Sequence, residues 1–212
     1  MNTQTHQHAV APRRPFRRAA FAASMACALL AVSTTTTAAQ RVVSADDSRR
    51  IQQVEPLYGP VGTEVSIYTE NLPLQAKVHV GVGATRTGFE ALLEAEQGVW
   101  GEVGATITIP ESAPWDRAVL LVAFDATFAP IGLSDPFHVT RADGILQRTG
   151  EITSEGVECL AMRDTDGFLY TLVGNVGGLE AGQPAVIQAR YVETSICMQG
   201  TTLEVVRILP PA

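Results

Sequence analysis

Lysine, histidine and cysteine are scarce in this chain of 212 residues. It has one lysine (Lys77), four histidines and three cysteines, and aromatic residues make up 6% of it. Three cysteines exclude a disulfide-dense miniprotein. A hydrophobic content of 46% excludes a disordered chain, and no long amphipathic helix is predicted. The composition therefore fits one globular domain or two small ones.

The first 39 residues follow the plan of a bacterial signal peptide. Four arginines between residues 13 and 18 precede the apolar stretch 19–32, and small residues then lead to Ala39. This order predicts export, with cleavage after Ala39. The apolar stretch is shorter than the roughly 20 residues that a membrane-spanning helix needs. We therefore predict a periplasmic or secreted mature chain without a transmembrane span.

Residues 13–27 partly resemble two more specific export signals. Residues 13–16 (RRPF) resemble part of a twin-arginine signal, although the residues around them depart from that pattern, so the choice between general secretion and twin-arginine export stays open. Residues 24–27 (SMAC) lack the leucine that a lipoprotein signal carries three positions before its cysteine. A lipid anchor is therefore not expected.

Removal of the signal makes the chain strongly acidic. Residues 1–39 hold four arginines and no acidic residue, which leaves 11 basic and 22 acidic residues and a net charge of −11. Nucleic acids and anionic lipids bind proteins through lysines and arginines that displace counterions. Both are therefore excluded as partners.

The mature chain keeps two cysteines, Cys159 and Cys197. In an oxidising compartment such a pair predicts one disulfide, and the chain-entropy model assigns a loop of about 38 residues roughly 4 kcal/mol of stability. Two buried free thiols, or a redox or metal pair, are the alternatives. Neither a Cys-x-x-Cys spacing nor a nearby histidine supports a redox or metal role, so no metal or other cofactor is predicted.

Short β-rich runs follow a flexible lead-in at residues 40–50. Proline and glycine breakers separate these runs at the spacing of an all-β sandwich, predicted over residues 51–140. The runs are 65–68, 77–82, 106–109, 118–124 and 137–139. Six core residues are expected by name, Val65, Ile67, Val78, Val80, Ile107 and Ile109, together with alternate residues of 118–124. One stretch, Phe89–Gln97, looks helical because Phe89, Leu92 and Leu93 fall on one side of a helix, but it is too short to stand alone.

A sequence motif in this region carries a family resemblance. The residues Ile51, Val54, Pro56, Gly59-Pro60, Gly62-Thr63, Val65 and Ile67 resemble the opening of an IPT/TIG domain. Val78–Gly81, Thr106–Pro110 and Ser134–Val139 fall where that family places later strands. The resemblance implies an immunoglobulin-like β-sandwich.

After Arg141 the pattern starts again. Five further runs, at 144–149, 156–162, 168–173, 185–192 and 202–208, predict a small OB-like five-stranded barrel over residues 141–212. Residues 164–167 (DTDG) are expected to form a hairpin turn, since the twelfth position of a calcium loop would be Asn175 rather than glutamate. Parts of this region also resemble a small bacterial exported domain of uncharacterised function, which implies no activity.

No catalytic constellation emerges from the residues that usually carry chemistry. His79 and His138 lie within predicted strands and alternate with apolar neighbours, so both are expected to face outward. Glu90, Glu94 and Glu96, with Glu102, are interpreted as a solvated surface. No Ser-His-Asp order and no metal spacing exists. We therefore predict a protein that is not an enzyme.

Trp100 and Trp115 stand in predicted loops, where each could contact a ligand or plug the end of the sandwich. Three functions follow from these features. The first is an exported, non-catalytic binding or scaffolding protein of the bacterial envelope, acting on an envelope or extracellular protein. The second is a carbohydrate-binding module that uses a loop tryptophan to bind a glycan. The third is an accessory hydrolase, which would need a cleft with convergent carboxylates.

Overall fold

The computed structural model describes residues 49–70, 72–197 and 199–210. The predicted signal peptide and its cleavage site after Ala39 lie outside these residues. Fourteen strands and no α-helix are found in the described part of the chain. These residues belong to one compact unit, within which a sandwich and a closed barrel each have their own core. The predicted all-β class, a sandwich followed by a small five-stranded barrel, is confirmed.

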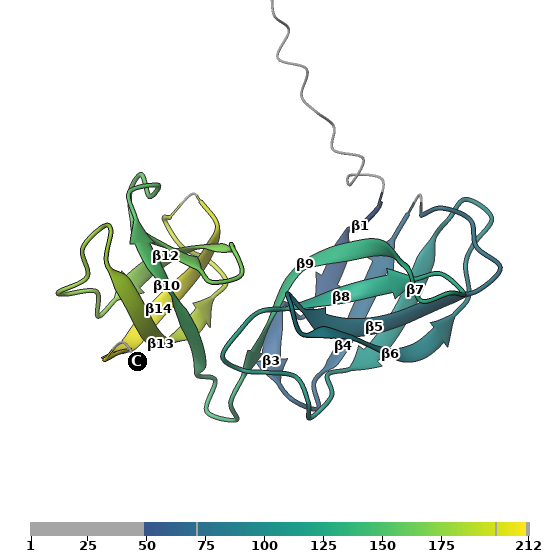
Figure 1. Cartoon of the computed structure of the whole chain (residues 1–212), viewed down its shortest axis with the longest axis horizontal. Coiled ribbons are helices and arrows are strands. Elements are labelled where there is room, and N and C mark those ends of the chain that lie inside the picture. Colours follow the sequence, from purple (N-terminus) through teal and green to yellow (C-terminus); the bar gives the residue numbers. More distant parts are fainter. Residues whose placement is uncertain (1–48, 71, 198, 211–212) are drawn as a thin grey trace, which may run out of the picture. The chain divides into compact units, whose positions relative to one another are not determined.

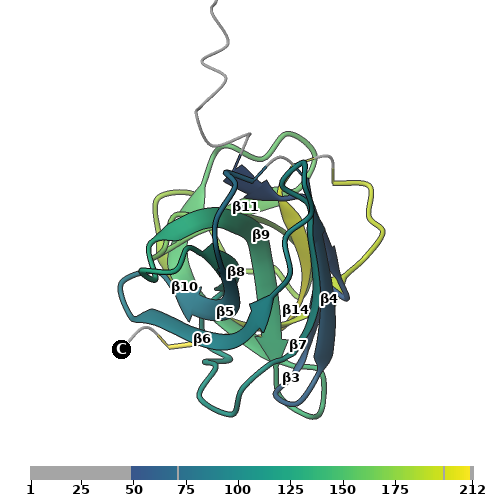
Figure 2. The ribbon, with the colours of Figure 1, turned by 90° about the vertical axis from the view of Figure 1, so that its right-hand side faces the viewer.

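Two sheets form the sandwich (Figure 1). The larger sheet has the order β1-β9-β8-β5-β6, with β3 also paired to β9, and the smaller sheet has the order β2-β4-β7. Figure 2 shows β4 and β7 as a layer beside the curved layer of β5, β6, β8 and β9. The strands are β1 (Arg50–Ile51), β2 (Gln53–Glu55), β3 (Tyr58–Pro60), β4 (Glu64–Thr69), β5 (Val78–Ala84), β6 (Gly88–Ala95), β7 (Val103–Thr108), β8 (Val119–Phe124) and β9 (Pro130–Thr140).

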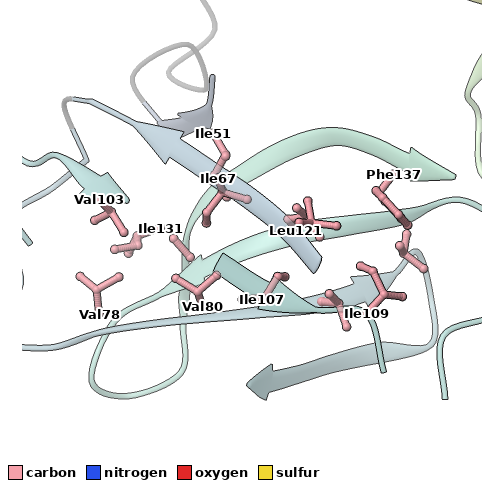
Figure 3. Packing of buried hydrophobic residues seen from close by; sticks show 14 of the residues in the cluster. Ile51, Ile67, Val78, Val80, Val103, Ile107, Ile109, Leu121, Ile131 and Phe137 are labelled. Atoms are coloured by element: carbon pink, nitrogen blue, oxygen red, sulfur yellow. The ribbon is translucent and has the colours of Figure 1, made fainter. Parts of the chain in front are cut away.

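Alternation of apolar and polar residues builds the sandwich core. In β4, Val65 and Ile67 are buried between the sheets, whereas Ser66 lies on the surface, as the period of two in a strand requires. Figure 3 shows how residues of both sheets meet in this core. All six predicted core residues are at most 3% exposed, which confirms that prediction.

Phe89–Gln97, which looks helical in the sequence but too short to stand alone as a helix, forms most of strand β6 (Gly88–Ala95). The pairing of β6 with β5 contains a β-bulge: Val80 pairs with Leu93 and Gly81 with Ala91, so Leu92 is the extra residue. A bulge lets two consecutive side chains approach the same face, and Leu92 and Leu93 both pack against the core. This doubled apolar pair imitates the spacing of a helix.

The second part of the chain is a closed barrel with the strand order β10-β11-β12-β14-β13. Only the β12–β14 pair is parallel, and β10 closes the barrel by pairing with β13. This order is that of an OB-fold, as predicted. The strands are β10 (Leu146–Thr153), β11 (Leu160–Asp164), β12 (Leu169–Gly174), β13 (Pro184–Val192) and β14 (Thr201–Leu209). Its core includes Leu146, Ile152, Met162, Tyr170, Leu172, Ile187 and Leu203.

The turn between β11 and β12 is the predicted hairpin turn. Oδ1 of Asp164 accepts hydrogen bonds from the backbone N–H of Asp166 at 2.9 Å and of Phe168 at 2.8 Å. Gly167 has a φ of +92°, which a side chain would disfavour. The carboxylate of Asp164 therefore stabilises the turn by accepting its backbone N–H groups.

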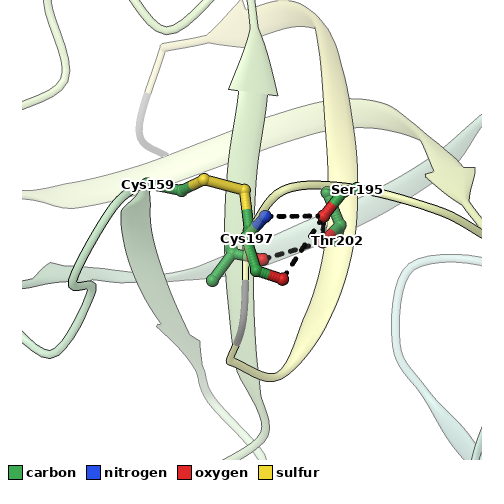
Figure 4. Close-up of a disulfide and its surroundings, with 5 residues drawn as sticks. Cys159, Ser195, Cys197 and Thr202 are labelled. Atoms are coloured by element: carbon green, nitrogen blue, oxygen red, sulfur yellow. Dashed lines mark hydrogen bonds between the residues drawn. A yellow bond between two sulfur atoms is a disulfide. The ribbon is translucent and has the colours of Figure 1, made fainter.

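The disulfide joins two loops of the barrel (Figure 4). Cys159 lies between β10 and β11, and Cys197 lies between β13 and β14, with Cα atoms 5.7 Å apart. We expected Cys159 within a strand, but β11 begins one residue later. Oγ of Ser195 accepts the N–H of Cys197 at 3.0 Å and lies 2.7 Å from Oγ1 of Thr202, which ties this loop to β14.

Candidate functional site

Three connections lie together at one end of the sandwich: β4 to β5 (70–77), β6 to β7 (96–102) and β8 to β9 (125–129). The strand registers place them there. Thr69 pairs with Val103, Val78 with Ala95, and His79 with Phe124, so each connection starts or ends beside another. Ends of sandwiches are where loops present binding residues from a rigid frame.

Large apolar side chains are exposed on all three connections. Val99 and Trp100 are each 78% exposed, Leu74 is 66% exposed and Phe128 is 57% exposed. We call these four residues the apolar loop end. Of the four, only Trp100 is predicted from the sequence as a possible ligand contact. The sequence feature that could have indicated the other three is the presence of large apolar residues inside loop segments next to glycine or proline.

Hydrogen bonds between the loops fix the β4–β5 connection against the β6–β7 connection. The side chain of Gln97 accepts the N–H of Gln75 at 2.8 Å and donates to the carbonyl of Pro73 at 3.2 Å. The N–H of Leu72 also donates to the carbonyl of Gly101 at 3.2 Å. Leu74 is thereby held close to the segment that carries Val99 and Trp100.

The tryptophan stands on a tight turn. Oε2 of Glu102 accepts the backbone N–H of Trp100 at 3.0 Å, and the carbonyl of Glu102 accepts the N–H of Gly98 at 2.8 Å. A Cβ added to Gly98 would lie 2.3 Å from Oε2 of Glu102, so a larger residue there would require the Glu102 carboxylate to move. The turn therefore exposes Trp100 in an ordered backbone conformation.

Phe128 is positioned by the carboxylate of Asp125. Oδ1 of Asp125 accepts hydrogen bonds from the hydroxyl and the backbone N–H of Thr127, both at 2.7 Å, and from the N–H of Ala129 at 3.0 Å. These bonds, that of the Thr127 hydroxyl first, lower the pKa of Asp125. The Phe128 ring stacks on His79, with ring centres 4.7 Å apart.

Trp115 belongs to the packed interior of the sandwich and not to the apolar loop end. Its side chain packs against the sandwich core, and the guanidinium of Arg141 lies 5.7 Å from its ring. Its carbonyl accepts hydrogen bonds from the N–H of Gln147 and from Nη1 of Arg148, both at 3.2 Å. The two tryptophans therefore have different roles.

The prediction that His138 faces solvent is wrong, since the residue is 1% exposed. Arg148 of β10, itself fully buried, covers it: Nη2 of Arg148 lies 3.0 Å from Nδ1 of His138, and Nε donates to the hydroxyl of Tyr170 at 3.2 Å. Burial, and then the charge of Arg148, lower the pKa of His138 well below its usual value. Alternation within β9 gave no sign of this cover.

The predicted glutamate surface is exposed at Glu90, Glu94 and Glu96, whereas Glu102 is half-buried in the turn below Trp100. Glu94 pairs with Lys77 at 3.0 Å, and Glu90 accepts a hydrogen bond from the Ser112 hydroxyl at 3.0 Å. These carboxylates do not converge on one point. Within residues 49–70, 72–197 and 199–210, no group of three His, Cys, Asp or Glu side chains is arranged to hold a metal ion.

Comparisons of the chain with protein-family models, with curated proteins and with solved structures find no match. The resemblance to IPT/TIG domains and to an exported two-cysteine domain therefore stays a prediction. In the part of the chain that the structure describes, no helix is both long and apolar enough to cross a membrane.

Proposed function

We propose that this chain is an exported, non-catalytic binding or scaffolding protein of the bacterial envelope, and that it contacts a protein partner through the apolar loop end. The observation that carries this proposal is the exposure of four large apolar side chains on three connections at the same end of the sandwich. Apolar residues exposed singly are ordinary on protein surfaces, whereas several exposed at one end of a domain indicate an interaction site.

The composition and rigidity of the apolar loop end favour a protein partner. Tryptophan is among the residues that contribute most to protein interfaces. Hydrogen bonds that Glu102 accepts, and that Gln97 accepts and donates, fix the loops that carry Trp100 and Leu74. Loops ordered before binding lose little conformational entropy when a partner arrives.

A carbohydrate-binding module is the second candidate, since the exposed ring of Trp100 could stack on a sugar. Sugars also need polar groups that bind their hydroxyls. Val99, next to Trp100 in the sequence, and Leu74, on the connection that is hydrogen-bonded to the same turn, are both exposed and aliphatic. This arrangement favours protein over glycan.

The export of the chain is proposed from the signal-peptide pattern of residues 1–39. The disulfide between Cys159 and Cys197 is compatible with an oxidising compartment outside the cytoplasm. The accessory-hydrolase alternative has no specific observation in its favour.

The test compares the wild-type chain with a variant carrying Leu74→Ser, Val99→Ser and Trp100→Ser. Each tagged protein is purified from the bacterial envelope, and co-purifying proteins are identified by mass spectrometry. Val61→Ser with Val206→Ser is the matched control, because Val61 and Val206 are exposed valines outside the apolar loop end.

We expect a partner that co-purifies with the wild type and the control but is lost from the triple variant, whose melting temperature should be unchanged. Retention of every partner by the triple variant would overturn the proposal. A glycan array that binds the wild type but not Trp100→Ser would favour the carbohydrate-binding candidate instead.

A further inference from the structure

A groove of about 470 Å³ lies at the end of the sandwich opposite to the apolar loop end. One wall is the β5–β6 hairpin, with Gly83, Thr87 and Phe89, and the other is the connection from β7 to β8, with residues 112–114, 116 and 117. The hydroxyl of Ser112 donates to Oε2 of Glu90 across the groove. The volume falls in the range of ligand-binding pockets, roughly 300 to 1,000 Å³.

The groove lies beside an unpaired strand edge. β6 is the last strand of its sheet: it pairs with β5 on one side, and no named strand of the described residues pairs with its other side. Residues 88–91 of β6 are all exposed. An open edge of this kind offers backbone N–H and C=O groups to an incoming strand.

Carboxylates outnumber cations around the groove, although Arg86 is exposed in the β5–β6 turn next to Thr87. Glu90 and Asp116 line it and are exposed, and Glu111 is exposed beside them. Arg117 also lines the groove, but its side chain is engaged elsewhere: Nη1 donates to the carbonyl of Thr85 at 3.3 Å, and Nε lies 3.5 Å from the buried carboxylate of Asp166. The free charge in the groove is therefore that of carboxylates.

An aromatic surface completes the groove. Phe89 lies opposite Gly83 in the β5–β6 pairing and is 52% exposed. A Cβ on Gly83 would lie 2.1 Å from the Phe89 ring, so glycine at this position lets the ring lie against the sheet. Because Phe89 and Glu90 are consecutive in β6, the ring and the carboxylate lie on opposite faces of the strand, so the ring suits an apolar side chain and the carboxylate suits a cationic one.

We propose that this groove binds an extended, basic peptide segment of a protein partner, which adds a strand to the outer edge of β6. The peptide backbone pairs with residues 88–91. An arginine or lysine side chain of the peptide displaces Ser112 from Glu90, and the next peptide side chain, on the other face of the strand, contacts Phe89. The proposal rests on the proposed function in taking a protein as the partner, but it uses a surface at the other end of the sandwich.

The test uses the full mature chain and a fluorescent synthetic peptide of about eight residues in which arginine alternates with valine, a length typical of one strand. Fluorescence anisotropy gives the Kd. One control peptide replaces each arginine with glutamate, and a second carries N-methyl groups on alternate backbone nitrogens, which then cannot donate hydrogen bonds. The protein variants are Glu90→Gln, Phe89→Ser and, as a matched control, Glu204→Gln on the barrel.

We expect binding of the arginine peptide alone, with a Kd that rises about tenfold for Glu90→Gln and for Phe89→Ser and stays unchanged for Glu204→Gln. Binding should weaken as salt rises. If the N-methylated peptide binds as tightly as the arginine peptide, the proposal that the peptide adds a strand is wrong. If Glu90→Gln binds the arginine peptide as tightly as the wild type does, the proposal that the peptide binds in the groove is wrong. The variant with serine at positions 74, 99 and 100 should bind the peptide with the same Kd as the wild type. Failure of the proposed function at the apolar loop end can therefore be distinguished from failure of the groove proposal.

Discussion

Nη2 of Arg148 lies 3.0 Å from Nδ1 of His138, and both side chains are buried. Arginine has only donors, so Nδ1 accepts and the imidazole is neutral with its proton on Nε2. The same guanidinium donates to the hydroxyl of Tyr170 and to the carbonyls of Trp115 and Gln147. One arginine of the barrel thus satisfies polar groups of the sandwich and of its own strands.

Replacing Arg148 with methionine should destabilise the protein. The substitution leaves the hydroxyl of Tyr170, Nδ1 of His138 and the carbonyl of Trp115 without this donor, and a buried polar group left without a partner costs about 1 to 3 kcal/mol. We expect a loss of about 3 kcal/mol in the free energy of unfolding, measured by urea titration. Arg190→Met, at an exposed site on β13, is the control and should change the midpoint little. An unchanged midpoint for Arg148→Met would show that the buried arginine contributes nothing.

Stability should fall as the pH drops below about 6.5, the usual histidine pKa. Because burial lowers the pKa of His138 in the folded state, both states are neutral above that pH, and below it only the unfolded state takes up the proton. The expected slope from this residue is about 1.4 kcal/mol per pH unit between about pH 6 and pH 5. His138→Asn, which keeps an acceptor for Arg148 but does not titrate, should remove that slope. An equal slope in wild type and variant would contradict this assignment.

The disulfide between Cys159 and Cys197 should contribute roughly 2 to 5 kcal/mol, since it joins cysteines 38 residues apart. Cys159→Ser with Cys197→Ser should therefore lower the melting temperature in calorimetry. Reductant should lower the melting temperature of the wild type toward that of the variant and leave the variant unaffected. Two reactive thiols in the oxidised, exported protein would show that the bond is absent.

The two tryptophans should differ in fluorescence. Trp100 is 78% exposed, whereas Trp115 packs against the core. We expect Trp115→Phe, which leaves only Trp100, to emit at longer wavelength and to be quenched by acrylamide several-fold more strongly than Trp100→Phe. Similar quenching of the two variants would mean that the turn at Gly98 and Gly101 does not expose Trp100.

The sequence predicted the fold through local patterns. Strict alternation around Val65 and Ile67 placed β4, and the Asp164–Gly167 turn placed the hairpin between β11 and β12. The strand over Phe89–Gln97 was not recognised from the sequence, because a bulge at Leu92 breaks the period of two. No local pattern reveals a bulge that depends on pairing with β5.

The candidate site was less predictable than the fold. Trp100 stood out by its residue type, but the exposure of Leu74 and Phe128 depends on loop conformations set by Gln97 and Asp125. The burial of His138 depends on a cover supplied by Arg148, a residue of another strand. The pattern of a single sequence reveals the periodicity within a strand, but it does not reveal the contacts between one strand or loop and another.

Photo-crosslinking in the producing bacterium tests the central claim, a protein contact at the apolar loop end, most directly. A benzophenone amino acid replaces Trp100 in one strain and Val61, an exposed residue at the β3–β4 turn, in another. We predict a discrete protein adduct of the exported chain on irradiation of the Trp100 strain and none in the Val61 strain. Absence of any adduct at position 100, or the same adduct from both positions, would contradict the claim.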